Sequence, residues 1–417
     1  MLRGAGGDGG DQRDGYGGGE REAHVSSVPR VSEPRLVTPA FVRLWLATLG
    51  AFATFGMLVL ALPLYVKDEL DYGSVGVGIA VGAASVTSVV FSVVSGRLGD
   101  RHGRRPLLVV GGLVMLVCYL GLALLPGLPG VVAIRLVAGA AEATFVVGVY
   151  TATMDVTPEA RRGEAVSLVT LASYLGLSFG PVLADFVRGS GRYTLVWLVT
   201  AGFVLAATAV VATLSETKPA TEEASGSWLP PRGALRPGLL VVLGLLGFGG
   251  FVAFAAIYAR DVGIERPGLI FALFGGVVSL VRLFGRKLPD ALGATRTLEL
   301  SFVCLAAGLA LIGSWQTETG LIVGTVIFAV GQAMTYPSAV LLAVQSTSAA
   351  ERSAVVGSVG AAVDVALGVG ALTLGAVAKF WGYGGAFLVA SAVALSGLAA
   401  LWPLRSSRTI AAESAGP

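Results

Sequence analysis

The sequence predicts an all-α membrane protein in which twelve transmembrane helices form two six-helix bundles related by pseudo-symmetry. Three observations lead to this prediction. Of the 417 residues, 54% are hydrophobic and only 13% are charged, and the mean hydropathy of +0.79 is far above that of soluble domains. Apolar runs long enough to cross a bilayer occur in two sets, separated by a polar stretch. A short charged motif occupies the same place in both sets.

Residues 1–40 differ in composition from the rest of the chain. They are rich in Gly, Asp and Arg and contain no apolar stretch. Such a segment lacks the apolar surface needed to fold, and it has no hydrophobic region of the kind that a signal peptide requires. We expect residues 1–40 to be a disordered cytoplasmic tail.

Residues 41–214 are predicted to form the first bundle. About 20 helical residues, each rising about 1.5 Å, span the hydrocarbon core of a bilayer, and isolated Gly or Pro residues are tolerated inside such helices. Apolar runs with few charges are found at 41–66, 75–95, 107–125, 130–154, 165–187 and 194–214.

A polar, Pro-containing stretch at residues 215–236 is the predicted cytoplasmic linker. The second bundle, residues 237–404, contains the second set of apolar runs, and its shorter runs need their flanking residues to reach across the membrane. These runs are found at 238–258, 269–284, 298–315, 320–344, 354–378 and 385–402. Residues 405–417 follow as a second cytoplasmic tail.

The distribution of Lys and Arg predicts the orientation. Loops beside membrane helices carry an excess of these residues on the cytoplasmic side. We assign loops alternately from a cytoplasmic N-terminus. Of the 29 Lys and Arg residues, Arg135 then lies within a run and most of the others fall inside, including Arg282 in a basic region at 282–296. Those left outside are Lys67, Arg188, Arg192, Arg260, Arg266 and Lys379. We therefore expect a multi-pass protein of the plasma membrane with both termini in the cytoplasm.

A short basic segment, residues 96–106, joins the second and third predicted helices, and we predict a loop there. It places four arginines and an aspartate between two apolar runs. The residues that define its pattern are Gly96, Asp100, Gly103, Arg104 and Arg105. Residues 287–293 repeat the pattern in the second set, with Asp290 and Gly293 aligned on Asp100 and Gly103. Internal repeats of this kind are typical of transporters whose halves rock about a site near the membrane midplane.

The spacing of these residues resembles the loop signature between helices two and three of the major facilitator superfamily. The resemblance covers residues 41–402, and it implies the major facilitator fold and secondary transport by alternating access. It also implies an ion pair between Arg104 and Asp155, and a contact of Asp100 with the positive N-terminal end of the eleventh helix near Ser353. We expect these contacts to latch the cytoplasmic side shut. The alternative is that the charges are solvated.

The fifth predicted helix carries Gly176, Gly180 and Pro181, which form a face of small residues followed by a helix-bending proline. This pattern resembles the Gly-Pro signature of bacterial drug:proton antiporters. In this sequence Ala184 and Asp185 stand where that signature continues with two glycines. The match favours export. The alternative is that the glycines only allow tight helix packing, which is compatible with either direction of transport.

Ionisable residues inside apolar runs are candidates for ion coupling, because a charge is costly there. Arg135 and Glu142 lie seven residues apart on one face of the fourth helix, and Arg135 with Gly139 resembles the superfamily's helix-four signature beside the proton-coupling site. Asp364 lies deep in the eleventh helix. We expect Glu142 to carry the proton, with its protonation changing as Arg135 moves, and Asp364 to affect affinity for cationic substrates. The alternatives are that Arg135 and Glu142 only neutralise neighbouring charges and that Asp364 only forms a structural hydrogen bond. Asp185 is the next candidate carrier.

Polar side chains on two predicted helices are candidates for the substrate cavity. Gln332 and Tyr336 lie four residues apart in the tenth helix and share a face. Alignment of the two halves places Tyr174 opposite Asp364. Such side chains can orient a polar group in an otherwise apolar cavity. Hydrogen bonding to a neighbouring helix is the alternative.

Several function classes are disfavoured by the sequence. It contains no phosphate-binding Gly loop for ATP and no spacing of His or Cys typical of a metal site. A net charge of +3 without a basic face disfavours nucleic acid as a partner. We expect no enzyme activity, no metal and no cofactor, with protons as the coupling ion. The expected partners of a monomeric chain are a small-molecule substrate and the lipid bilayer.

The predicted function is proton-coupled efflux of a small, largely apolar organic compound across the plasma membrane. The small number of polar side chains within the apolar runs favours an apolar substrate. One alternative is a proton-coupled importer of a small metabolite or sugar. An alternative of another class is a substrate-sensing or lipid-translocating membrane protein without coupled antiport.

Overall fold

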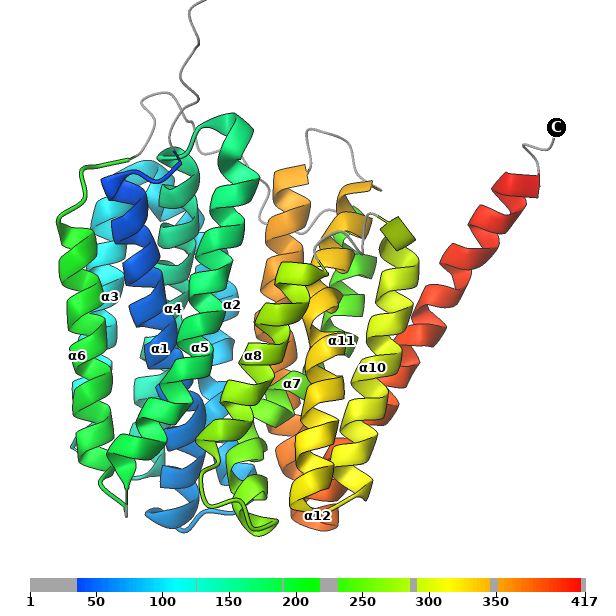
Figure 1. Ribbon diagram of the computed structural model, residues 1–417. Coiled ribbons are helices and arrows are strands. Elements are labelled where there is room, and N and C mark those ends of the chain that lie inside the picture. The colour runs from blue at the N-terminus through cyan, green and yellow to red at the C-terminus, as the bar shows by residue number, and fades with distance from the viewer. Residues whose placement is uncertain are drawn as a thin grey trace, which may run out of the picture. The chain divides into compact units, whose positions relative to one another are not determined.

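The computed structural model describes residues 36–124, 126–189, 191–217, 232–285, 291–345 and 352–413, and these residues are almost entirely helical (Figure 1). The first half of the chain, here called the N-half, contains α1 (Pro39–Asp68), α2 (Ser74–His102), α3 (Arg104–Leu122), α4 (Leu128–Asp155), the one-turn helix η1 (Glu159–Arg161), α5 (Arg162–Arg188) and α6 (Tyr193–Ala212). The second half, the C-half, contains α7 (Arg232–Asp261), α8 (Gly268–Phe284), α10 (Ala294–Ser314), α11 (Glu318–Gln345) and α12 (Arg352–Glu413).

The helix α12 contains two membrane-crossing segments. Its backbone leaves helical geometry at Gly382, where φ is 68° and ψ is 178°. In the described part of the chain, 10 helices are long and apolar enough to cross a membrane when α12 counts once, and α8 is a shorter apolar helix of 17 residues. With α12 divided at Gly382 and α8 included, the predicted twelve crossings are present. The last helix continues to Glu413, past the boundary predicted at residue 404.

The basic segment 96–106 is helical on both sides of one glycine, so the loop predicted there is wrong. The helix α2 continues through His102 and α3 begins at Arg104, with only Gly103 between them. Composition marks where the membrane-buried part of a helix ends, whereas backbone hydrogen bonds extend the helix beyond it. Gly103 has φ of 102° and Gly293, which precedes α10, has φ of 84°. Glycine adopts this backbone region readily, and both halves therefore break at the equivalent place.

Burial divides the helices into central and peripheral ones. The membrane-crossing windows of α1 and α7 are each 72% buried within the protein, whereas that of α2 is 33% buried. The peripheral helices present apolar side chains such as Val90 and Val117 outward. A helix that is apolar all round but exposed on one side is suited to a lipid environment. The apolar side chains of the chain therefore pack both in the protein interior and against the surrounding hydrocarbon.

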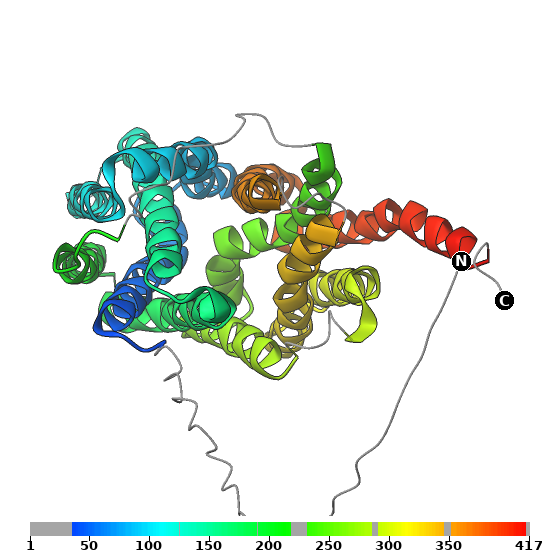
Figure 2. The same ribbon diagram turned by 90° about the horizontal axis from the view of Figure 1, so that it is seen from above.

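The two halves meet along two pairs of helices, α2 with the first segment of α12 and α5 with α8 (Figures 1 and 2). In Figure 2 the orange segment of α12 lies beside blue α2, and yellow-green α8 lies beside green α5. The end of the helices that carries the α1–α2 connection is here called the α1–α2 side. The opposite end, which carries Gly103, is called the α2–α3 side.

Three polar contacts join the two halves on the α1–α2 side. An ion pair joins Asp68 of α1 to Arg260 of α7 at 2.6 Å. The backbone N–H of Gly268, at the start of α8, donates to the Asp185 carboxylate of α5 over 3.2 Å, and a carboxylate is favoured at a helix N-terminus. The hydroxyl of Ser74 in α2 donates to a backbone carbonyl of α12 at 2.8 Å. These contacts, here called the seal, hold the halves together at this end.

Candidate functional site

The charged residues predicted in α4 form a buried pair. Arg135 Nη1 lies 2.6 Å from Glu142 Oε1, and the side chains are only 10% and 17% exposed. Tyr119 of α3 donates its hydroxyl proton to the same carboxylate oxygen over 2.8 Å. All three residues belong to the N-half. Glu142 is therefore held by partners that move together with it.

The predicted carboxylate in α12 has a partner in the other half of the protein. Ser92 of α2 donates its hydroxyl proton to Asp364 Oδ2 over 3.1 Å. Asp364 also lies near enough to Glu142 for their charges to interact. Because α2 and α12 belong to different halves, a motion that separates these helices must break the bond between Ser92 and Asp364.

Arg282, which lies in both the predicted apolar run 269–284 and the predicted basic region 282–296, is in a membrane helix. Arg282 is in the last turn of α8, and its guanidinium carbon lies 4.5 Å from the centre of the Tyr174 ring in α5. Its Nε atom is buried without a hydrogen-bond partner. The sequence analysis did not name Arg282 as a site residue, because it lies near the end of its apolar run and was counted with the basic residues that follow.

The tyrosines predicted for the substrate cavity lie around this arginine. Tyr336 of α11 lies within electrostatic range of Arg282, Tyr174 and Tyr150. The Tyr150 hydroxyl lies 3.4 Å from the Ser173 hydroxyl of α5. The alignment of the two halves made Tyr174 and Asp364 equivalent positions, and in the structure each contacts a helix of the other half, Tyr174 against α8 and Asp364 against α2.

Gln332, the remaining predicted cavity residue, is buried in α11. It is 8% exposed, and its Oε1 atom lacks a hydrogen-bond partner. An unpartnered buried amide oxygen is costly unless a ligand or water bonds to it. Gln332 lies one helical turn before Tyr336, on the same face of α11. The predicted pair thus remains a candidate for contact with a substrate.

The motif at the α2–α3 side is organised around Arg104. Its Nη1 atom lies 2.5 Å from Asp100 Oδ1 and its Nε atom lies 3.0 Å from Asp155 Oδ2, so the expected pair with Asp155 is present. The sequence analysis expected Asp100 to contact the N-terminal end of the eleventh helix near Ser353. Asp100 bonds Arg104, and Ser353's side chain lies outside what the structure describes, so that contact stays a prediction. These contacts therefore stay within the N-half.

Glu216, which follows α6, completes this motif and was missed from the sequence. Its carboxylate accepts the backbone N–H of Arg104 at 2.7 Å and that of Arg105 at 3.3 Å. An anion at a helix N-terminus satisfies N–H groups that have no partner within the helix. Arg105 in turn donates to the Ala212 carbonyl at the end of α6 over 2.8 Å. The only local signal was an acidic residue at the start of the predicted linker.

The other glycines of the motif differ in their surroundings. A side chain added at Gly96 or at Gly293 would meet open space. Gly293 is instead required by its positive φ, as described above. Asp290, its predicted companion, lies outside the described residues.

The small residues of α5 form a close crossing with α1. A β-carbon added at Gly176 would lie 2.6 Å from the Leu49 carbonyl oxygen, and one added at Gly180 would overlap the Ala53 carbonyl oxygen. Pro181 packs against Gly56 of α1. Small residues allow helix backbones to approach closely in membranes. The predicted Gly-Pro motif therefore sets the α1–α5 distance in this structure.

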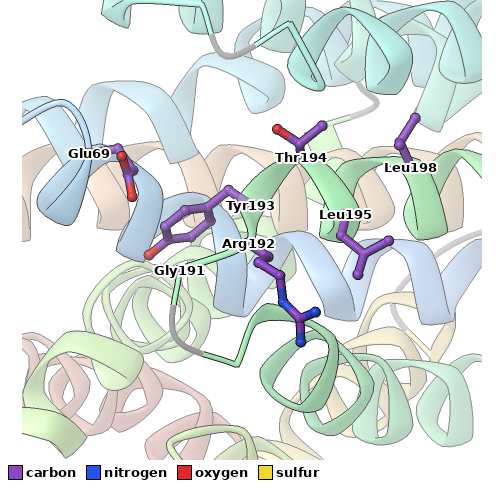
Figure 3. A pocket seen from close by; sticks show the side chains of 7 residues that line it. All are labelled: Glu69, Gly191, Arg192, Tyr193, Thr194, Leu195 and Leu198. Carbon is purple, nitrogen blue, oxygen red and sulfur yellow. The ribbon is translucent and has the colours of Figure 1, made fainter.

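The pocket shown in Figure 3 lies at the α1–α2 side, away from the polar residues just described. Its volume is about 350 Å³, and it is lined by Glu69, Gly191, Arg192, Tyr193, Thr194, Leu195 and Leu198. It contains no residue of the predicted coupling or substrate sites. We therefore base the candidate site on the arrangement of side chains in the helices rather than on this pocket.

Comparison with known proteins identifies the family. The sequence model of the Major Facilitator Superfamily matches residues 44–298 and 238–417, and these two matches cover nearly all of the helical part. The chain belongs to the Major Facilitator Superfamily. It is thus a multi-pass membrane transporter rather than an enzyme, and the family works as secondary transporters by alternating access.

Relatives and solved structures agree with this membership. The chain is 26% identical to an uncharacterized MFS-type transporter of Salmonella typhimurium and 23% identical to the staphylopine export protein of Staphylococcus aureus. Each alignment covers 84% of this chain and 92% of the relative. Among solved structures, a mutant of the nucleoside transporter NupG superposes with a TM-score of 0.75 at 12% identity, over 87% of this chain and 99% of that one. The last similarity shows the fold.

Proposed function

We propose that this superfamily member exports a small, largely apolar organic compound across the plasma membrane in exchange for protons. The observation that carries the proposal is the bond between Ser92 and Asp364. It places an ionisable group deep in the bundle on a contact between halves that must open and close during alternating access. Protonation of Asp364 is thereby linked to the motion of the halves, as antiport requires.

The direction and orientation rest on separate arguments. A relative at 23% identity is named for export, and the Gly-Pro motif of α5 resembles that of drug:proton antiporters. Lys and Arg are concentrated in the connections of the α2–α3 side, which by the positive-inside rule faces the cytoplasm together with both termini. The seal then closes the outer side in this structure. We propose that the chain acts as a monomer in the lipid bilayer without a cofactor.

The geometry changes the order of the two candidate proton carriers. The partners of Glu142, Arg135 and Tyr119, both lie in the N-half and stay with it as the halves rock. The partner of Asp364 lies in the opposite half. A proton carrier must change its surroundings between the two states of the transporter. We therefore propose Asp364 as the carrier, with the Arg135–Glu142 pair holding α4 and α3 in place.

The first prediction concerns Asp364→Asn in proteoliposomes loaded with substrates found in a screen of toxic compounds. This change should lower accumulation driven by a pH gradient at least tenfold while substrate exchange without a gradient continues, because the amide keeps the hydrogen bond but cannot cycle a proton. Glu142→Gln, compared at equal amounts of folded protein, should keep uphill transport. The measurement is radiolabelled substrate flux in both directions.

The two flux directions also distinguish export from import. Everted vesicles that accumulate the substrate when their interior is made acidic support export with protons moving outward from the lumen. Accumulation only in right-side-out vesicles would indicate import instead. Uphill transport that persists in Asp364→Asn but disappears in Glu142→Gln would return the coupling role to Glu142.

A further inference from the structure

Arg282 carries a positive charge for which the described part of the chain provides no carboxylate. Its recorded contact is with the face of the Tyr174 ring, and its Nε atom is buried without a hydrogen-bond partner. By contrast, the buried arginine of α4, Arg135, has Glu142 at 2.6 Å. Charged groups within membrane helices are normally paired, because an uncompensated charge there is costly. The two arginines thus differ in whether the protein itself supplies their counter-ion.

The surroundings of Arg282 come from helices of both halves. Tyr150 of α4 and Tyr174 of α5 belong to the N-half, and Tyr336 of α11 belongs to the C-half. Tyr174 and Tyr336 lie within electrostatic range of Arg282, and the three tyrosines lie within electrostatic range of one another. Aromatic rings provide apolar surface, and their hydroxyl groups can bond a polar substituent. A cation with such a lining, built from both halves, is suited to a ligand with an anionic group on an apolar body.

We propose that Arg282 binds an anionic group of the transported compound, most simply a carboxylate. A planar guanidinium offers two parallel N–H donors to a carboxylate, and the stacked Tyr174 ring fixes the plane of that fork. Gln332, with an unpartnered buried oxygen on α11, is available for a donor group elsewhere on the same compound. This inference rests on the proposed function and specifies the substrate class. A compound with an apolar body and one negative charge fits the largely apolar substrate proposed above and also supplies the anionic group for Arg282.

The contact between α8 and α5 gives the site a role in the cycle. The guanidinium of the C-half lies 4.5 Å from the ring centre of Tyr174 in the N-half, and a cation over an aromatic face is attracted to it. A carboxylate bound in the plane of the fork leaves the ring on the guanidinium face, so the two contacts can exist together. Because Arg282 and Tyr174 belong to different halves, the anion should bind best while α8 lies against α5. This is the differential interaction by which a substrate can favour one state of a transporter.

The experiment uses full-length protein in lipid nanodiscs and compares three compounds with one carbon skeleton. Phenylbutyrate is the anion, phenylbutyramide is its neutral counterpart and phenylbutylamine is the cation. The wild type should bind the anion at least tenfold more tightly than the other two, as measured by the shift of the thermal unfolding midpoint against ligand concentration. Arg282→Gln should lose this preference, and Arg282→Lys should retain part of it because it keeps the charge but not the planar fork.

Control variants separate this role from a general loss of stability. Arg266→Gln removes the same charge from an exposed position before α8 and should bind the anion as the wild type does. Tyr174→Phe should keep at least half of the affinity for the anion, because the ring face remains, whereas Tyr174→Leu should weaken binding several-fold. Each variant's unfolding midpoint without ligand, measured in parallel, reports whether it is folded.

The possible outcomes decide the proposal independently of the direction of transport. A wild type that binds none of the three compounds, or that prefers the amide or the amine, overturns it. Anion binding that survives unchanged in Arg282→Gln overturns it as well. If anion binding depends on Arg282 but no pH gradient drives uphill flux in either direction, the anion site stands and the antiport proposal fails.

Discussion

At the scale of single residues, the buried pair of α4 shows how a membrane helix carries two charges. Arg135 and Glu142 lie two helical turns apart, so a direct contact requires Arg135's long side chain to extend along the helix. The hydroxyl of Tyr119 adds a third group from α3. This network neutralises both charges within one half of the protein, and it ties α3 to α4.

This network predicts a large loss of stability when one charge is removed. Glu142→Gln leaves Arg135 buried without its counter-ion, and breaking a buried pair in this way costs about 3–5 kcal/mol. The double variant Arg135→Gln with Glu142→Gln should lose less than the sum of the two single variants. Unfolding titrations in mixed detergent micelles measure the difference, with Glu265→Gln as an exposed control. Additive losses would show that the two side chains do not stabilise each other.

At the scale of helices, the crossing of α1 and α5 depends on two glycines. The backbone of α1 passes so close to Gly176 and Gly180 that a β-carbon at either position would collide with carbonyl oxygens of α1. Backbone atoms cannot move aside as the end of a side chain can. The two helices can therefore keep their present spacing only with glycine at both positions.

Substitution at this crossing should thus be far more costly than on an open helix face. Gly180→Ala should destabilise the protein by about 1–3 kcal/mol, as over-packing in a close-packed interior does. Gly202→Ala in α6 is the matched control, because a side chain there meets nothing within 4 Å. Thermal unfolding of both variants in detergent tests the difference. Equal midpoints for the two variants would contradict this account of the crossing.

At the scale of the whole membrane domain, contacts on the two sides have different partners. On the α1–α2 side, Asp68 pairs with Arg260 and Asp185 caps α8, and both contacts join the two halves. On the α2–α3 side, Arg104 bonds Asp100 and Asp155 within one half. The seal contacts therefore join the halves at the side that we propose to be external.

Weakening the seal should shift the protein toward the opposite state. The side chains of Asp68 and Arg260 are 28% and 41% exposed, so solvent screens their attraction, and their pair is worth at most about 1 kcal/mol. Asp68→Asn should change the ratio of the two states by up to about fivefold. Spin labels at Gly73→Cys and Glu265→Cys, in a background without Cys118 and Cys304, report the distance across the seal. An unchanged distance distribution would show that the pair does not hold this side closed.

Much of the fold and part of the site could be predicted because their signals are local. Hydropathy over about 20 residues is sufficient to place the membrane crossings. The positive φ of Gly103 and Gly293 agrees with their place in the repeated motif, and the contact of Arg104 with Asp155 followed from the family resemblance. The exact helix ends were less predictable, since α2 runs past the apolar segment as far as Gly103.

The residues that join the halves could be identified only in the tertiary structure. Nothing near Asp364 in the sequence points to Ser92, and nothing near Arg282 points to Tyr174. The sequence by itself determined that the chain crosses the membrane in two related sets of helices, because transfer of apolar side chains into hydrocarbon depends on composition alone. Only the tertiary structure decided that Asp364 bonds Ser92 of the other half and that the described residues provide no carboxylate for Arg282, because these facts depend on which faces of distant helices meet.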